Sequence, residues 1–378
     1  MDAIFGKVEQ NQHFRSYDVA EELEIDHKTV LTHLKQSLKH KKVHFSVKGI
    51  IAPVFAPIDE HGQLNLDVIP EYAKHLSENR VDGVVVVLPV GRLVNSSTDI
   101  LKTLVGIHLR FVLRLSPMQT VVGGTSGEAM CLSVEERQSL LEAWISSARP
   151  LGLKVMAQVG GAPMPDVLAL ANHAELVMAD GMMTLPELYF KPKTPTKLVD
   201  YLEEISAAAP TVPLIYYHFP AMSGVDMNMP ELYREATRRI PNFKGFKADL
   251  NVAVQLEELL APDHRVFIAN HLLAPSVLMG HASSIATVTN LFPSLIRDLV
   301  DSASSSNPPT SLMRKQSKLN SMVAAITDQG KWEFVPSMKV AMELITGISV
   351  GDPRKPLTAL DQQQRDIMVM RLNKIIGN

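Results

Sequence analysis

The chain has a single cysteine, Cys131, among its 378 residues. One cysteine excludes a disulfide within the chain and is typical of proteins from a reducing compartment. No apolar run reaches the roughly 18–20 residues that a membrane-spanning helix needs, and the opening stretch MDAIFGKVEQNQHFR has no apolar signal region. We therefore expect a cytoplasmic protein with no membrane partner.

A strong charge of either sign is also missing. The 37 Lys and Arg nearly balance the 40 Asp and Glu, which leaves a net charge of −3. This balance indicates no nucleic-acid partner for the protein as a whole. Apolar residues make up 46% of the chain, enough for one large domain with appendages or for two ordinary domains.

Residues 1–43 differ in pattern from the rest of the chain. The stretch 18–35 reads as two short helices broken at Ile25 and Asp26, with Asp26 as a plausible cap of the second. It resembles the helix-turn-helix near the start of mariner-type transposases, whose second helix reads DNA. Residues 1–48 contain eight Lys or Arg and seven Asp or Glu, however. This near-neutral balance favours a fused remnant or a tether over a working DNA-binding module.

From residue 44 onward, short apolar runs alternate with helical patterns. We predict eight strands, and continuous apolar runs such as 84–88 indicate strands buried on both faces. Eight such units over residues 44–302 fit a (β/α)8 TIM barrel, an α/β fold of about 250 residues. An open doubly wound sheet is the rival, but no dinucleotide fingerprint follows the first strand. The predicted strands are 49–56, 84–88, 154–159, 181–185, 213–219, 243–248, 265–269 and 284–289. The predicted helices are 66–77, 133–148, 165–176, 196–208, 230–240, 252–260, 272–279 and 292–302.

Two segments do not belong to this alternation. Residues 88–122 form a long connection that is unusual between a barrel strand and its helix. It is rich in Ile, Leu and Val, so it could form a hairpin, pack on the rim or be a segment foreign to the fold. Residues 303–378 are helical by pattern, with apolar stretches at 322–326 and 338–345 and a last helix at 362–376. We expect these three helices to pack beside the barrel as a C-terminal appendage.

Two reactive side chains end neighbouring predicted strands. Tyr217 follows the apolar run that begins at residue 213, and Lys247 ends the run that begins at Phe243. If the strands are parallel neighbours, both side chains open to one rim and can act on one ligand. A desolvated lysine favours the neutral amine that a Schiff base requires, and a phenol beside it can move a proton. The plain structural alternatives are a lysine that reaches solvent and a tyrosine that closes the barrel top.

The motif GGTSGE, residues 123–128, precedes the helix expected at 133–148. Ser133 with Glu136 three residues later is a capping-box pattern. Paired glycines allow backbone N–H groups to approach an anion, and Thr125 and Ser126 add hydroxyl donors. These features suit a carboxylate. No Lys-Ser/Thr follows the last glycine, which excludes a phosphate-binding P-loop.

Together the motifs YYHFPAMSGV, IPNFKGFKAD about thirty residues later, and GGTSGE resemble the pyruvate-dependent class I aldolases of the dihydrodipicolinate synthase superfamily. The resemblance covers the chain from about residue 47 to the C-terminus, except for 88–122. It implies a TIM barrel with C-terminal helices, a homotetramer, and no metal or organic cofactor. By the same resemblance Lys247 is the Schiff-base lysine, Tyr217 the proton-shuttling tyrosine, and Thr125 and Ser126 the pair that holds the pyruvate carboxylate.

The sequence departs from the sialic-acid-cleaving branch of that family on the sugar side. Where a Gly-x-Asp-Glu turn is usual after the seventh strand, this chain has Asn270 and His271. Asp249 stands where a Ser or Thr is usual two residues after the lysine, and Thr287 keeps a hydroxyl on strand eight. We expect Asp249, Asn270, His271 and Thr287 to bind substrate beside Thr125 and Ser126.

The predicted activity is cleavage of a 2-keto acid, with N-acetylneuraminate the first candidate, to pyruvate and an aldehyde. One alternative is the same imine chemistry on another keto acid, such as a shorter sugar acid or a hydroxyproline-derived one. A non-enzyme alternative is an inactive scaffold or DNA-tethering fusion in which the 88–122 segment has displaced GGTSGE.

Overall fold

The computed structural model describes residues 45–87, 126–269, 271–306 and 308–376. The predicted helix-turn-helix segment 1–43, the insertion 88–122, and the predicted ligands Thr125 and Asn270 lie outside the described residues. The domain boundaries proposed at residues 43 and 302 stay predictions.

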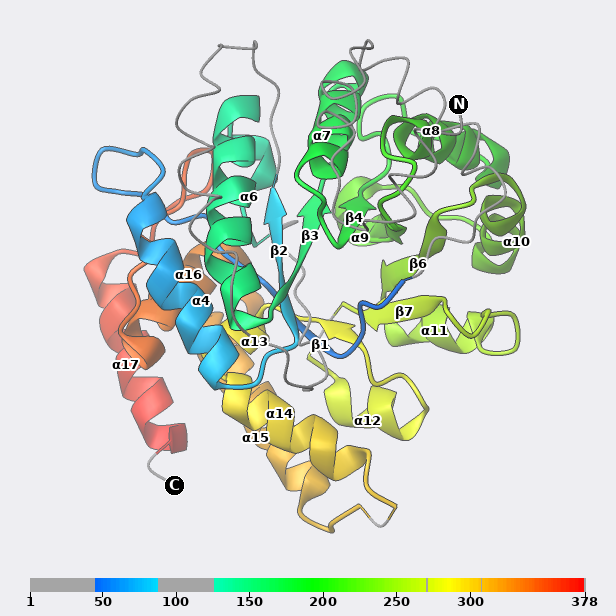
Figure 1. The fold of residues 1–378 in the computed structure, drawn as a ribbon. Helices are drawn as coiled ribbons and strands as arrows, with labels where there is room; N and C mark the ends of the chain where they lie inside the picture. Colours follow the sequence, from blue (N-terminus) through cyan, green and yellow to red (C-terminus); the bar gives the residue numbers. More distant parts are fainter. Residues whose placement is uncertain (1–44, 88–125, 270, 307, 377–378) are drawn as a thin grey trace.

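Eight parallel strands close into a barrel in chain order, and β8 pairs with β1 (Figure 1). This confirms the predicted (β/α)8 TIM barrel, in which eight parallel strands alternate with helices and close in chain order. The strands are β1 (Ile50–Pro53), β2 (Gly83–Val87), β3 (Lys154–Gln158), β4 (Gly181–Thr184), β5 (Leu214–Tyr217), β6 (Phe243–Ala248), β7 (Arg265–Ile268) and β8 (Ser284–Ile285).

Helices surround the barrel and cover the outer face of its strands (Figure 1). Ser133 caps α6 in the predicted capping box: the Ser133 Oγ accepts from the N–H of Glu136, and the Glu136 carboxylate accepts from the N–H of Ser133. The barrel helices are α4 (Ile69–Glu78), α6 (Val134–Ala148), α7 (Met164–Leu176), α8 (Pro195–Ala208), α9 (Pro220–Ser223), α10 (Met229–Arg239), α11 (Leu250–Leu256), α12 (Leu273–Leu278), α13 (Val288–Leu291) and α14 (Pro293–Ala303), with single turns η1 (Leu66–Val68), η3 (Ala129–Cys131) and η4 (Arg149–Leu151).

The eighth strand is much shorter than the predicted 284–289. It ends at Ile285, and α13 begins at Val288. Asn290, in this short helix, donates from Nδ2 to the carbonyl of Pro53 at 2.9 Å and accepts from the Tyr72 hydroxyl at 2.8 Å. These buried bonds tie the helix across the top of β1, a long-range effect that local β-propensity does not report.

The C-terminal segment forms three further helices, α15 (Leu312–Ile326), α16 (Phe334–Thr346) and α17 (Gln362–Ile376), with the single turn η5 (Asp328–Gly330) between the first two. In Figure 1 they run in orange and red beside the barrel: α15 packs on α12 and α14, and α16 packs on α13. The helix α17 packs on α15 and α16. This confirms the predicted appendage and places α16 against the same part of the barrel as β8.

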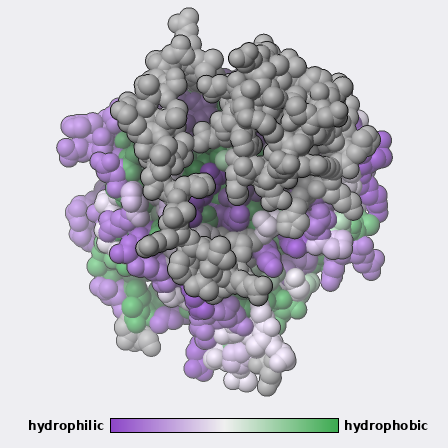
Figure 2. All heavy atoms as spheres, viewed as in Figure 1, coloured by the Kyte–Doolittle hydropathy of each residue, from purple (hydrophilic) through white to green (hydrophobic). Residues whose placement is uncertain are grey.

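The core is continuous from the barrel interior to the surrounding helices. All four residues of β1, β4 and β5 are buried, as expected for parallel strands covered on both faces. On the face drawn in Figure 2, the described residues present hydrophilic side chains interspersed with smaller apolar areas. Among the described helices, none combines the length and the apolar composition needed to cross a membrane.

Candidate active site

Lys247 is a buried lysine near the end of β6, with 4% of its surface exposed. Within the described part of the chain no carboxylate forms an ion pair with it. Burial alone lowers the pKa of Lys247 from its ordinary 10.5 to about 7, because the ammonium form loses its hydration. In about half of the protein molecules, the Lys247 side chain is therefore a neutral amine at pH 7, the form that attacks a carbonyl carbon.

Tyr217, the last residue of β5, is the register partner of Lys247 on the neighbouring strand. Partners in a parallel ladder place their side chains on the same face of the sheet. The ammonium nitrogen of Lys247 lies 3.9 Å from the centre of the Tyr217 ring, and the ring itself stacks on Phe219 at 5.7 Å between centroids. The N–H of His218 donates to the Lys247 carbonyl at 2.8 Å, which holds the two strand ends together.

Gly245, two residues before Lys247, has a backbone conformation that an L side chain rarely adopts, with φ +133°. It stands where the register between β5 and β6 shifts, as in a β-bulge. A Cβ at this position would lie 1.9 Å from the carbonyl oxygen of Arg265 on β7. The bulge and the close approach of β7 thus require glycine, and both set where Lys247 emerges at the strand end.

Two hydroxyls meet at a second edge of the barrel mouth. Ser126 Oγ and Thr287 Oγ1 lie 2.7 Å apart, one from the GGTSGE motif and the other just after β8. Ser126 is 3% exposed. A pair of converging hydroxyls can donate to the two oxygens of a carboxylate, so the structure brings together two of the predicted substrate ligands.

The other predicted ligands have individual settings. Asp249 is exposed, and its carboxylate accepts from the Val252 N–H at 3.2 Å as the N-cap of α11, which starts two residues earlier than predicted. His271 follows β7, and burial lowers the pKa of its imidazole. Substrate binding by Asp249 and His271, like the roles of the other site residues, stays a prediction.

Two features near the strand ends were not predicted from the sequence. His218 is buried beside Tyr217, and its Nε2 lies 3.5 Å from the carboxylate of Asp226. Burial lowers the pKa of His218, and the nearby Asp226 opposes this effect. The second feature is a buried ion pair between Glu128 and Lys339. The sequence could have indicated this pair, because Lys339 stands inside the apolar stretch 338–345. An amphipathic helix normally keeps a lysine on its solvent face.

Among the residues described, no group of three or more His, Cys, Asp or Glu side chains comes together in a way that could hold a metal ion. The chemistry available at this mouth is that of an amine of low basicity, a phenol and a pair of hydroxyls. An amine of this kind forms an imine with a ketone and needs a nearby proton carrier, which is the arrangement on β5 and β6.

Comparison with known proteins agrees with this geometry. Residues 116–375 match the Dihydrodipicolinate synthetase family. The N-acetylneuraminate lyase of Sus scrofa is 25% identical over 334 residues, which cover 87% of this chain and 93% of that protein.

Two solved structures share the fold. The N-acetylneuraminate lyase (sialic acid aldolase) of Aliivibrio salmonicida is 26% identical with a TM-score of 0.70, covering 89% of this chain and 98% of its own. The 4-hydroxy-tetrahydrodipicolinate synthase of Methylacidiphilum fumariolicum SolV has the same TM-score at 20% identity, covering 88% and 97%. The chain belongs to the dihydrodipicolinate synthetase family, and it is a lyase of the class I aldolase type that works through a Schiff base.

Proposed function

We propose that this chain cleaves N-acetylneuraminate to N-acetylmannosamine and pyruvate through an imine on Lys247. The observation that carries the proposal is the buried amine of Lys247 against Tyr217, beside the hydroxyls of Ser126 and Thr287. The lyases from Sus scrofa and Aliivibrio salmonicida, which are similar over most of this chain, support this substrate.

The proposed reaction begins when the neutral amine of Lys247 attacks C2 of the keto acid. Water leaves and an imine forms. Tyr217 takes the proton of the C4 hydroxyl as the C3–C4 bond breaks, and the bonding electrons move to C3 to give an enamine and the free aldehyde. Protonation of C3 and hydrolysis of the imine then release pyruvate and restore the amine.

The substrate carboxylate has its place at Ser126 and Thr287, with Thr125 as the predicted third hydroxyl. A carboxylate held there fixes C2 against Lys247. This orientation raises the reaction rate more than tighter binding of the substrate would by itself. Asn270, His271 and Asp249 are the proposed contacts of the sugar chain, because amide, imidazole and carboxylate groups can hydrogen-bond a polyol.

A second candidate is the same chemistry on a different 2-keto acid. It is favoured by the stretch 268–271, Ile-Ala-Asn-His, which has neither the glycine nor the carboxylate pair expected for a sialic-acid binder. The capping of α11 by Asp249 points the same way, since a carboxylate engaged with a backbone N–H is less available to a sugar hydroxyl.

Reductive trapping tests the imine. The protein is incubated with pyruvate and cyanoborohydride, and its peptides are analysed by mass spectrometry. We expect one reduced pyruvate on the peptide that contains Lys247 and none in K247M. Absence of this adduct from the unmodified protein would refute the proposed imine on Lys247.

Substrate choice needs a separate measurement. Pyruvate release is followed with N-acetylneuraminate and with a panel of 2-keto acids that includes shorter sugar acids and hydroxyproline-derived ones. The highest kcat/KM on N-acetylneuraminate is expected. A higher value on another member of the panel would transfer the assignment to the second candidate.

A further inference from the structure

Lys339 is a buried cation that the proposed reaction does not use. It lies in α16 and is 2% exposed. Its ammonium group has three acceptors: Glu128 Oε1 at 2.8 Å, the Asp352 carbonyl at 3.1 Å and the Ala56 carbonyl at 3.2 Å. An ammonium has three protons to donate, so this set satisfies it completely.

Its partner Glu128 is held just as fully. The second oxygen of the Glu128 carboxylate accepts from the N–H of Arg354 at 2.7 Å. The Glu128 backbone is left-handed, with φ 54°, and its carbonyl accepts from the N–H of Cys131 at 2.8 Å. Glu128 therefore fixes a tight turn whose geometry few residues adopt without support.

This turn lies two residues after Ser126, whose hydroxyl meets Thr287 at the barrel mouth. A second tie lies further along the same segment, where Arg354 forms a bidentate ion pair with the carboxylate of Glu136. The loop that carries Ser126 is thus clamped by residues that come more than 200 positions later in the chain, since Lys339 is 211 residues from Glu128.

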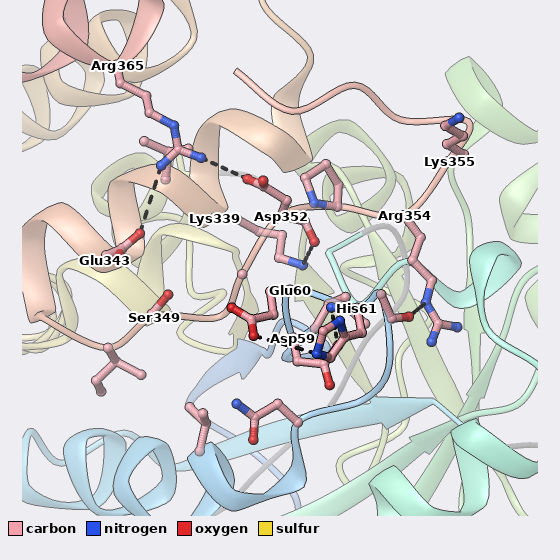
Figure 3. Close-up of a pocket in the computed structure, with 18 of the residues that line it drawn as sticks. Asp59, Glu60, His61, Lys339, Glu343, Ser349, Asp352, Arg354, Lys355 and Arg365 are labelled. Atoms are coloured by element: carbon pink, nitrogen blue, oxygen red, sulfur yellow. Dashed lines mark hydrogen bonds and ion pairs between the residues drawn. The ribbon is translucent and has the colours of Figure 1, made fainter. Parts of the chain in front are cut away.

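Figure 3 shows the C-terminal side of this clamp. Lys339 points from α16 toward the carbonyl of Asp352, in the wall of a cleft of about 970 Å³ that Arg354 and Lys355 also line. Most charges drawn there are engaged with one another, as in the pairs of Arg365 with Asp352 and Glu343. With most of its charges engaged in this way, we assign no ligand to the cleft.

A buried ion pair is a weak source of net stability, because the loss of hydration offsets most of the attraction. Its directional bonds, in contrast, hold groups in one relative position. We propose that Lys339 is a positioning residue of the aldolase site: by holding Glu128, it orients Ser126 toward Thr287 and so places the carboxylate of the keto acid. This inference rests on the proposed imine chemistry at Lys247.

The test measures the pyruvate concentration that half-saturates reductive trapping at Lys247. In K339M we expect this concentration to rise between about tenfold and about a hundredfold, with the trapping rate at saturating pyruvate close to that of the unmodified protein. E128Q keeps the side-chain volume and the acceptor for Arg354 but loses the charge. It should raise the half-saturating concentration in the same direction, and it serves as the second variant if K339M does not fold.

The matched control is K244M. Lys244 is 3% exposed and pairs with Asp263 at 2.8 Å, but it makes no contact with the loop of Ser126 among the described residues. We expect K244M to lower the urea midpoint of unfolding and to leave the half-saturating pyruvate concentration unchanged.

Three results separate the possibilities. No trapping in the unmodified protein refutes the proposed function itself. Trapping in that protein with unchanged half-saturation in both K339M and E128Q overturns the positioning role and leaves the proposed imine on Lys247 intact. A raised half-saturation in K244M as large as in K339M also overturns it, because the effect would then follow from lost stability.

Discussion

The pH at which Lys247 becomes reactive follows directly from its burial. With an ordinary pKa of 10.5, roughly one lysine in 3,000 would be neutral at pH 7, whereas with a pKa of about 7 half of them are. The change in environment thus raises the fraction of nucleophile at neutral pH roughly 1,500-fold. A base with a lowered pKa loses its proton at lower pH, so imine formation should rise through pH 7 and level off above about pH 8.

The assay is the initial rate of reductive trapping with pyruvate at concentrations well below saturation. Cyanoborohydride is chosen because it survives mild acid, which allows measurements from about pH 5.5 to about pH 9.5. The adduct is quantified on the peptide that contains Lys247, and K247M reports any labelling that arises from other amines.

A trapping rate that still rises steeply above pH 9 would refute the reasoning. It would mean that water reaches the amine of Lys247 and that its pKa stays near 10.5. A midpoint near pH 7 supports desolvation as the cause, because burial is the effect that lowers the pKa of this side chain in the part of the chain that the structure describes.

Three further changes have defined outcomes. K247M should stabilise the fold most below pH 7, by up to about 5 kcal/mol, because it removes an amine whose pKa burial lowers from 10.5 to about 7. The gain should shrink as pH rises toward 10.5, where the unfolded lysine is neutral too. Urea midpoints of both proteins at several pH values measure this, and a pH-independent difference would contradict it. Y217F keeps the ring beneath Lys247 but removes the phenol, so turnover should fall about 10²- to 10⁴-fold while pyruvate trapping persists, and turnover within a few fold of normal would exclude Tyr217 as the proton carrier. G245A places a Cβ 1.9 Å from the Arg265 carbonyl and should lower the melting temperature sharply, whereas G280A, also at positive φ but with open space around it, should have the smaller effect.

The barrel and the pair on β5 and β6 were predictable because the evidence for them is local. Parallel strands buried on both faces produce continuous apolar runs, and a lysine or tyrosine that ends such a run stands out against it. The register of β5 and β6 then brings Tyr217 and Lys247 together as expected for neighbouring parallel strands. The start of α6 was predictable in the same way, because Ser133 and Glu136 form the capping box that their spacing predicts.

Features that depend on distant parts of the chain were not predictable in this way. The pairing of Lys339 with Glu128 joins two segments 211 residues apart, and nothing in the local sequence of either names the other. The shortness of β8 depends on Asn290, which bonds across to β1. Asp249 is a different case, since an Asp directly before an apolar helical run is itself a helix-cap signal, and the capping role could have been predicted beside the binding role.

The position of Lys247 over the face of Tyr217 raises the question of which effect sets its charge. A cation above an aromatic ring gains about 2 kcal/mol when it is desolvated, which favours the ammonium form and raises its pKa. Burial acts in the opposite direction and lowers the pKa of Lys247 to about 7, which is the larger effect, so desolvation dominates. In the proposed reaction the protonated imine carries its positive charge at the same nitrogen. The ring that fails to keep the lysine protonated before reaction therefore stabilises the charged intermediate once the imine has formed, and Y217F retains this part of the function.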